Sequence, residues 1–208
     1  MNVEDAIRHR RTIRHFTDEP VSAVMIRELL GLATLAPNVA NRQMWRFIII
    51  TTPEIRKMLS DMVRRRIDEM ATWPELEGQK SRLQAWREQA QPFNEAPALI
   101  IFVNQGYRTA LDLALVERGV KHWEVANMFG HPDVQSVSAA ISFLVLAAEE
   151  REYGTCWMTA PLAAQKDLQA ALELKPGEEI VAIVGLGKPA EKPLPKERKK
   201  IDEIIEWR

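Results

Sequence analysis

The sequence predicts a three-layer α/β/α fold, in which helices cover both faces of one β-sheet. Three short runs, at residues 45–51, 98–103 and 180–184, are mostly apolar on both sides. That pattern is typical of strands buried on both faces. Helical patterns separate these runs along the chain, so helices are available to cover each face. The pattern leaves the direction of the strands open.

Two helices are expected before the first strand. Asn2 is a suitable N-cap for a helix over residues 3–9, because its side chain can accept a hydrogen bond from a free backbone N–H group. Ser22 can cap the second helix, whose apolar residues recur at helical spacing. Pro37 should end this helix at Ala36, since proline disfavours a helical conformation in the residue before it.

The middle of the chain is predicted to form a long helix and the second strand. Residues 52–54 are a strong helix start, because a cap residue is followed by proline and then by an acid. This helix is expected to end near residue 70. A second, polar helix should follow the interruption at Trp73 and extend to about residue 91.

Residues 104–131 have the weakest pattern in the chain. Residues 110–118 are expected to be helical, whereas residues 123–129 fit a loop or a broken helix. We expect this segment to be mobile and to lie near a substrate.

The stretch from Asp133 to Glu150 is predicted to be a helix that is apolar around almost its whole circumference. Such a helix is buried on all sides, either inside one core or across a subunit contact. A chain of 208 residues has limited interior for it. The helix therefore favours a homodimer.

The last quarter of the chain is expected to contain two extended segments, a helix between them and a short closing helix. Residues 155–158 should form a short strand or an extended loop, residues 163–172 an amphipathic helix, and residues 179–187 the last strand. A tail rich in proline and lysine follows, and a short closing helix is expected at 201–207.

Composition favours an ordinary soluble protein. Hydrophobic residues make up 46% of the chain, and 28 basic and 29 acidic residues give a formal net charge of −1. This balance offers no global reason to expect nucleic acid or an anionic membrane as a partner. No apolar run approaches the roughly 18 to 20 residues of a membrane span. The one cysteine, Cys156, cannot form an internal disulfide, so a cytoplasmic location is expected.

Several familiar catalytic patterns are missing from the sequence. The four histidines show no zinc-binding spacing, so no metal site is expected, and there is neither a P-loop nor a nucleophile elbow. Cys156, within an apolar stretch, fits a small core residue better than a nucleophile. An enzyme with this sequence would take its reactivity from a cofactor. The six tryptophans suggest an interface or a site for a flat ligand.

Four arginines fall within residues 8–14. A guanidinium group is always charged and presents forked donors that suit phosphate and carboxylate. A solvated surface is the simplest alternative for such a cluster. However, the apolar Ile13 and Phe16 flank Arg14, and the acidic Asp18 and Glu19 follow, which does not fit a targeting sequence. The arginines are therefore expected at the entrance to a folded domain.

Together with this segment, three others resemble the nitroreductase family of FMN-dependent NAD(P)H oxidoreductases. The four segments are residues 10–16 (RRTIRHF), 36–47 (APNVANRQMWRF), 154–160 (GTCWMTA) and 187–193 (GKPAEKP). They occur in the family's order and span nearly the whole chain. The resemblance implies that residues 1–208 form a single FMN-binding domain. It also implies an α+β fold, with a central mixed β-sheet between helical layers, in an intertwined homodimer.

The resemblance implies that both ends of the chain bind the cofactor. Arg10 and Arg198 would bind the FMN phosphate, with Lys196 nearby and Thr12 adding a hydroxyl group. Two arginines suit a dianionic phosphate because each can donate bidentate, charge-assisted hydrogen bonds. Arg14 would lie against the pyrimidine edge of the flavin, where a cation stabilises the negative charge of the reduced ring.

Two further segments would contact the flavin. The loop after Pro37 would cradle the ribityl chain and ring through Asn38, Val39, Asn41 and Gln43. The other side of the isoalloxazine would be lined by Trp157, Met158, Thr159 and Ala160. Arg11 belongs to the same cofactor-binding set without a particular role. Asn41 and Gln43 could instead be turn formers, and Lys196 and Arg198 could solvate a tail. Asn38 and Met44 stand where the family usually has serine and proline.

The implied activity is reduction of a small oxidised acceptor at the expense of NAD(P)H. In the family, NAD(P)H reduces the flavin and departs, and an acceptor such as a nitroaromatic or a quinone takes its place in a ping-pong cycle. The flavin N5 carries the chemistry, so no catalytic side chain is expected. Two alternatives remain open: different flavin chemistry, such as reductive dehalogenation or flavin fragmentation, and a non-catalytic flavin-binding protein.

Overall fold

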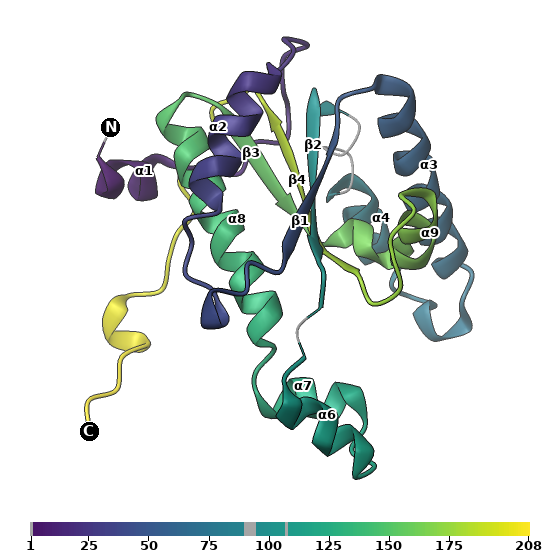
Figure 1. The fold of residues 1–208 in the computed structure, drawn as a ribbon. Helices are drawn as coiled ribbons and strands as arrows, with labels where there is room; N and C mark the ends of the chain where they lie inside the picture. The colour runs from purple at the N-terminus through teal and green to yellow at the C-terminus, as the bar shows by residue number, and fades with distance from the viewer. Residues whose placement is uncertain (1, 90–94, 107) are drawn as a thin grey trace.

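A four-stranded sheet forms the centre of the computed structural model, which describes residues 2–89, 95–106 and 108–208 (Figure 1). Its order is β1-β2-β4-β3, and each neighbouring pair is antiparallel. The four strands therefore form an antiparallel sheet rather than the mixed sheet that was expected, and one isolated parallel bridge, between Thr12 and Thr155, lies at the β3 edge. The strands are β1 (Trp45–Ile50), β2 (Ala98–Asn104), β3 (Gly154–Met158) and β4 (Glu179–Gly187).

Helices cover both faces of this sheet, which confirms the predicted three layers (Figure 1). Ile100 and Phe102 of β2 point into the core beneath one helical layer, whereas Leu99 and Ile101 point into the other. All four side chains are fully buried. One layer contains α2 (Ala23–Ala33) and α8 (Pro132–Glu150), and the other contains α3 (Pro53–Met70) and α9 (Gln165–Ala171).

The predicted caps of the first two helices are confirmed. The Asn2 side chain accepts a hydrogen bond from the backbone N–H of Asp5 at the start of α1 (Val3–His9). Ser22 does the same for Met25 in α2. Thr52 stands at the N-cap of α3 as expected, but its side chain makes no capping hydrogen bond.

Several boundaries differ from the sequence prediction. Helix α2 ends at Ala33 rather than Ala36, and the helix expected at 163–172 divides into the 3-10 turn η3 and α9. The closing helix expected at 201–207 is a single turn, and the apolar side chains of this stretch stay largely exposed, so little packing stabilises a longer helix. The expected end of α4 near residue 91 lies outside the described residues. The shorter elements are η1 (Val39–Asn41), η2 (Pro74–Leu76), α4 (Lys80–Gln89), η3 (Ala160–Ala164) and η4 (Ile201–Glu203).

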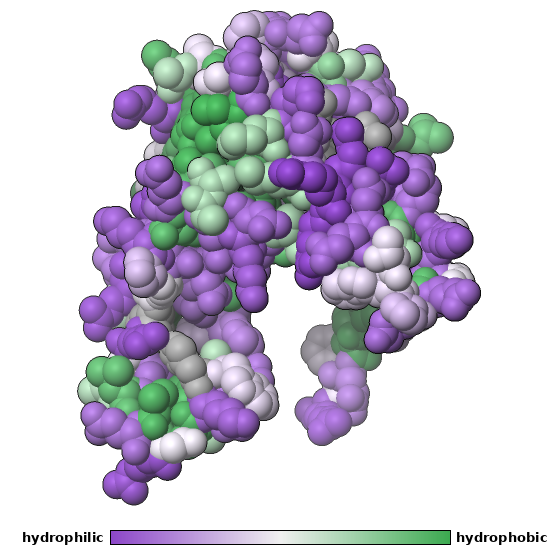
Figure 2. Space-filling model, turned by 90° about the vertical axis from the view of Figure 1, so that its right-hand side faces the viewer, coloured by the Kyte–Doolittle hydropathy of each residue, from purple (hydrophilic) through white to green (hydrophobic). Residues whose placement is uncertain are grey.

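The segment with the weakest sequence pattern forms two helices, α6 (Ala110–Glu117) and α7 (His122–Met128). Residues 123–129 are therefore mostly helical rather than a loop. Both helices project from the body of the molecule, as does the C-terminal segment (Figures 1 and 2). These projections carry exposed apolar side chains, including Leu111, Trp123, Met128, Ile204 and Trp207.

Helix α8 is not buried on all sides within one chain, so of the two predicted alternatives burial inside a single core is excluded and a subunit contact stays a prediction. Seven of its residues are buried, and six of these, among them Ile141 and Leu144, belong to the core formed with the sheet and α2. Phe143 and Val134 remain 41% and 37% exposed. A helix that is apolar all round thus leaves one side uncovered in the single chain. Within the described part of the chain, no helix is both long and apolar enough to cross a membrane.

Candidate functional site

A pocket of about 430 Å³ opens at the β3 edge of the sheet. One wall is formed by Arg14, the end of β3 and the η3 turn, and the opposite wall by α3, α4 and the turn between them. The lining residues are Arg14, Arg66, Met70, Trp73, Trp86, Cys156, Trp157, Met158, Thr159, Ala160 and Ala163. Five of the predicted cofactor-binding residues therefore meet here: Arg14, Trp157, Met158, Thr159 and Ala160.

The β3 wall follows from alternation along an edge strand. Cys156 and Met158 point into the core beneath α3, whereas Trp157 between them is 40% exposed. Successive strand residues point to opposite faces, so the side chain of Trp157 points away from that core, and the residue still contributes to the lining of the pocket. The chain then turns into η3, and Thr159 and Ala160 complete this side of the pocket.

The segment around Arg14 is fixed to β3 by its backbone and by close packing. The backbone N–H of Ile13 donates to the carbonyl of Thr155. Ile13 is buried directly over Gly154, where an added Cβ would lie 2.7 Å from the Ile13 side chain. Glycine is therefore required at 154 by this close approach. The contact places Arg14 beside the end of β3.

Glu191 holds the same segment from the C-terminal side. Its carboxylate accepts hydrogen bonds from the backbone N–H groups of Arg14 and His15. Partial burial opposes ionisation of Glu191, but the two hydrogen bonds together with the neighbouring positive charges outweigh it, and the pKa of the carboxyl is lowered. The carboxylate is therefore charged at neutral pH and anchors the backbone of Arg14.

Burial raises the pKa of the Cys156 thiol to about 11, although the nearby charge of Arg14 acts in the opposite direction. The thiol therefore stays protonated at neutral pH. This agrees with the interpretation of Cys156 as a core residue, because only the thiolate is a strong nucleophile.

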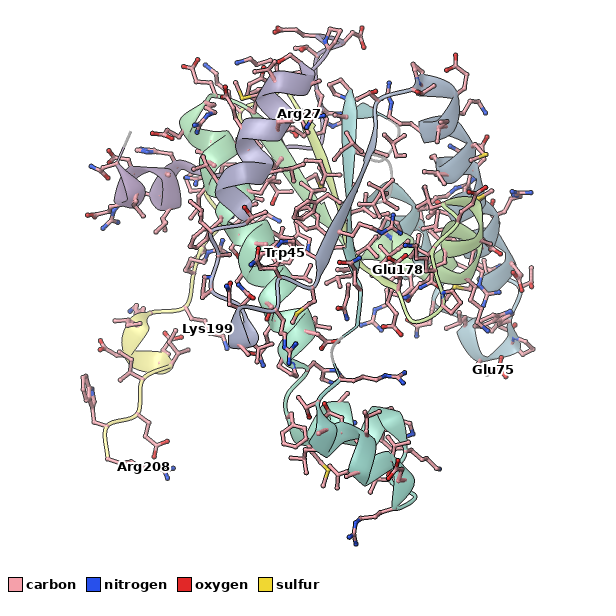
Figure 3. All side chains as sticks on the ribbon, viewed as in Figure 1. Arg27, Trp45, Glu75, Glu178, Lys199 and Arg208 are labelled. Carbon is pink, nitrogen blue, oxygen red and sulfur yellow. The ribbon has the colours of Figure 1, made fainter. Side chains whose placement is uncertain are left out.

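The remaining N-terminal and C-terminal candidates lie outside this pocket. Arg11 donates to the backbone carbonyls of Arg8 and Arg10, so its guanidinium closes the end of α1. Thr12 makes the bridge to β3. Lys196 and Arg198 are exposed on the C-terminal segment that leaves the body of the protein, next to the labelled Lys199 (Figure 3).

The loop after Pro37 has a defined conformation of its own. Its backbone enters the left-handed region at Ala40, Asn41 and Gln43, with φ of 48°, 50° and 48°. The Asn38 side chain closes the loop, because its Oδ1 accepts from the backbone N–H of Gln43 and its amide donates to the carbonyl of Ala36. The amide side chains of Asn41 and Gln43 are left exposed.

This loop does not meet the pocket within one chain. The backbone N–H of Val39 donates to the hydroxyl of Ser136 on α8. Helix α8 covers one face of the sheet, whereas the pocket lies on the α3 side. The loop candidates Asn38, Val39, Asn41 and Gln43 are therefore separated from Arg14 and the β3 wall by the sheet.

Sequence reasoning missed the opposite wall of the pocket. Arg66 and Met70 come from α3, Trp73 from the turn after it, and Trp86 from α4. The abundance of tryptophan was the available signal, but it did not indicate which indoles converge. The segment expected near a substrate, residues 104–131, contributes no described lining residue.

Comparison with known proteins agrees with the resemblance noted in the sequence. The family model for the nitroreductase family matches residues 7–188. YfhC of Bacillus subtilis, whose name assigns it to the NAD(P)H nitroreductases, is 27% identical over 94% of this chain and 89% of its own length. The iodotyrosine deiodinase of Haliscomenobacter hydrossis is 27% identical over 88% of this chain and 77% of its own. Among solved structures, a BluB-like flavoprotein from Clostridium difficile has the same fold, with a TM-score of 0.84 at 24% identity, over 100% of this chain and 99% of that one.

Proposed function

Because this chain belongs to the nitroreductase family, we propose that it is an FMN-dependent oxidoreductase that uses NAD(P)H to reduce nitroaromatic, quinone or similar acceptors. The observation that carries the proposal is the pocket where Arg14 meets residues 157–160. Reduction of a quinone to its hydroquinone takes two electrons and two protons. NAD(P)H supplies a hydride, and solvent supplies the second proton. We place the enzyme in the cytoplasm, since its one cysteine fits a reducing compartment.

The chemistry of the residues around the pocket fits FMN. When bound, FMN supplies the two-electron chemistry of the reaction. Arg14 brings a permanent positive charge to the site, and Glu191 fixes its backbone. A cation at the pyrimidine edge stabilises negative charge on a reduced ring. Trp157 and Thr159 provide an exposed wall against which a flat ring can lie.

We further propose that the active unit is a homodimer with FMN at the subunit interface. The loop at 37–43 and the pocket lie on opposite sides of the sheet, so one chain does not bring all candidate residues together. A second copy can supply the missing part. It would also cover Phe143 and the exposed apolar residues of α6, α7 and the C-terminal segment. Sedimentation that gives a stable, folded monomer would contradict this arrangement.

The absorbance spectrum of the purified protein tests the proposed cofactor directly. We expect the bands of a bound flavin, release of FMN on denaturation, and quinone-dependent oxidation of NAD(P)H. A colourless protein that cannot be reconstituted with FMN would overturn the proposal. A yellow protein that does not oxidise NAD(P)H would instead be a flavin-binding protein.

Arg10 and Arg198 are proposed to hold the FMN phosphate, with Lys196 nearby. Replacing either arginine by alanine is expected to weaken FMN binding by about 1.5–3 kcal/mol, as for loss of a charged hydrogen bond. The control is Arg27→Ala, because Arg27 is exposed on α2 (Figure 3) and has no proposed role. Equilibrium dialysis with FMN measures the effect. If both variants bind FMN as tightly as the unsubstituted protein, these arginines do not contact the cofactor and are solvated surface residues instead.

Reductive dehalogenation is a second candidate, favoured by the similarity to the Haliscomenobacter hydrossis deiodinase. In that reaction, the carbon–iodine bond of an aryl iodide breaks and iodide leaves, while two electrons and one proton form the new carbon–hydrogen bond. Release of iodide from iodotyrosine by the reduced protein distinguishes the two candidates. Turnover of quinones without iodide release favours the first.

A further inference from the structure

Three tryptophans line the same pocket, and the proposed function uses only one of them. Trp73 and Trp86 belong to the wall formed by α3, α4 and the turn that Glu75 marks in Figure 3. They are 37% and 44% exposed, and Trp157 across the pocket is 40% exposed. Indole rings left partly in solvent around one pocket provide a surface for a flat, apolar ligand.

The wall that contains Trp86 is held in place by contacts between α4 and the rest of the fold. Leu83 of α4 is buried, and Arg87 of α4 forms an ion pair with Asp68 of α3 at 3.5 Å. That ion pair is 42% and 53% exposed and therefore weak, so the burial of Leu83 is the main contact that holds α4 against the rest of the fold. Trp86 lies on the same helix and lines the pocket.

Arg66 brings a second positive charge to the pocket. Its guanidinium carbon lies 5.2 Å from the ring centroid of Trp73, within the range of a cation–π interaction. Its Nη1 is also 2.7 Å from a carboxylate oxygen of Glu69. That ion pair is 32% and 58% exposed, so it is weak and can give way to an anionic ligand.

The described lining of the pocket contains two arginines and neither a carboxylate nor a histidine. The proposed function assigns Arg14 to the cofactor. Arg66, on the opposite wall, is left to meet the acceptor. A guanidinium beside an indole face suits a molecule with an aromatic ring and an anionic group.

We propose that Arg66, Trp73 and Trp86 form the acceptor-binding wall and select planar aromatic acceptors that carry a carboxylate or a similar anionic group. This inference rests on the proposed function and specifies its acceptor. Trp73 and Trp86 pack against the ring, and Arg66 binds the anion. Neutral aromatic acceptors of the same size use the same wall without the charged contact.

The test compares 4-nitrobenzoate with 4-nitrobenzamide, which match in size and nitro group but differ in charge. Their dissociation constants are measured by calorimetry on the purified, oxidised protein without NAD(P)H. The benzoate is expected to bind about tenfold more tightly, as one partly exposed charged hydrogen bond allows. Arg66→Gln should remove this preference, whereas Arg66→Lys should keep part of it.

Two further variants separate the roles of charge and ring. Arg64→Gln is the matched control, because Arg64 is exposed on the same helix and does not line the pocket. It should leave both affinities unchanged. Trp86→Leu should weaken both ligands by about three- to tenfold while the preference for the benzoate persists.

Equal affinity for the two ligands in the unsubstituted protein would overturn the inference. So would a preference that survives in Arg66→Gln, since Arg14 would then be its source. A different result would contradict the proposed function: a protein that retains no FMN, or one that does not oxidise NAD(P)H when a quinone is present. Because calorimetry needs no turnover, the comparison of ligands is decisive in either case.

Discussion

Substitution of Gly154 by alanine tests how the N-terminal segment is held beside the pocket. An alanine Cβ at this position would lie 2.7, 2.8 and 2.9 Å from three side-chain atoms of Ile13, which is 6% exposed and cannot move freely. Overpacking of this kind costs about 1–3 kcal/mol. The smaller entropy of an unfolded chain with alanine offsets about 0.5–1 kcal/mol of that cost. We expect a net loss of about 1–2 kcal/mol in the free energy of unfolding.

Urea denaturation at a fixed FMN concentration measures the loss. Gly31→Ala is the control, because Gly31 lies in the last turn of α2, a Cβ there meets nothing within 4 Å, and alanine favours a helix. This control should stabilise the protein by about 0.5–1 kcal/mol. Ile13→Ala combined with Gly154→Ala should show a coupling energy, since the first change removes the clashing methyl groups. A Gly154→Ala protein as stable as the unsubstituted one would refute the reasoning.

Three other predictions concern buried or titrating groups. Arg46→Met should destabilise the fold by about 2–4 kcal/mol in urea denaturation, because it strands the buried carboxylate of Glu178, whereas Lys57→Met, at an exposed pair, should cost less than about 0.5 kcal/mol. The folded-state pKa of Glu191 is lowered, so its contribution to stability is present at neutral pH and lost as the pH falls through the range of carboxyl titration; denaturation curves of Glu191→Gln should show less of this acid dependence. With a pKa of about 11, Cys156 should resist thiol reagents at pH 8 in the folded protein and react once urea unfolds it; rapid modification of the folded protein would contradict its burial.

Local patterns predicted the elements that depend on short stretches of chain. Asn2 and Ser22 cap their helices because an N-cap needs only a suitable side chain and the next few backbone N–H groups. The buried strands β2 and β4 were recognisable because both faces of each lie beneath helices. The segment around Gly154 belongs to a recognisable motif, and the close approach of Ile13 supplies a physical reason for its glycine.

Local sequence patterns could not predict the contacts between segments that are distant along the chain. The strand order β1-β2-β4-β3 and the antiparallel pairing depend on the path that the chain takes between one strand and the next. The apolar composition of a strand does not predict that path. Helix α8 looked uniformly buried, yet Phe143 is exposed, because the apolar character of a helix does not specify whether its own chain or another covers each side. For the same reason, the predicted closing helix at 201–207 is longer than the single turn that forms at Ile201–Glu203.

Some residues of the candidate site were predicted from the sequence, and others were identified only in the tertiary structure. The sequence by itself determined the family resemblance, the basic N-terminal segment and the residues 157–160 that line the pocket. Only the tertiary structure decided that α3 and α4 provide the opposite wall, with Arg66, Trp73 and Trp86. It also decided that the loop at 37–43 lies across the sheet from this pocket. Periodicity describes how a segment is buried, whereas a binding site depends on which buried segments meet, and that follows from packing of the whole chain.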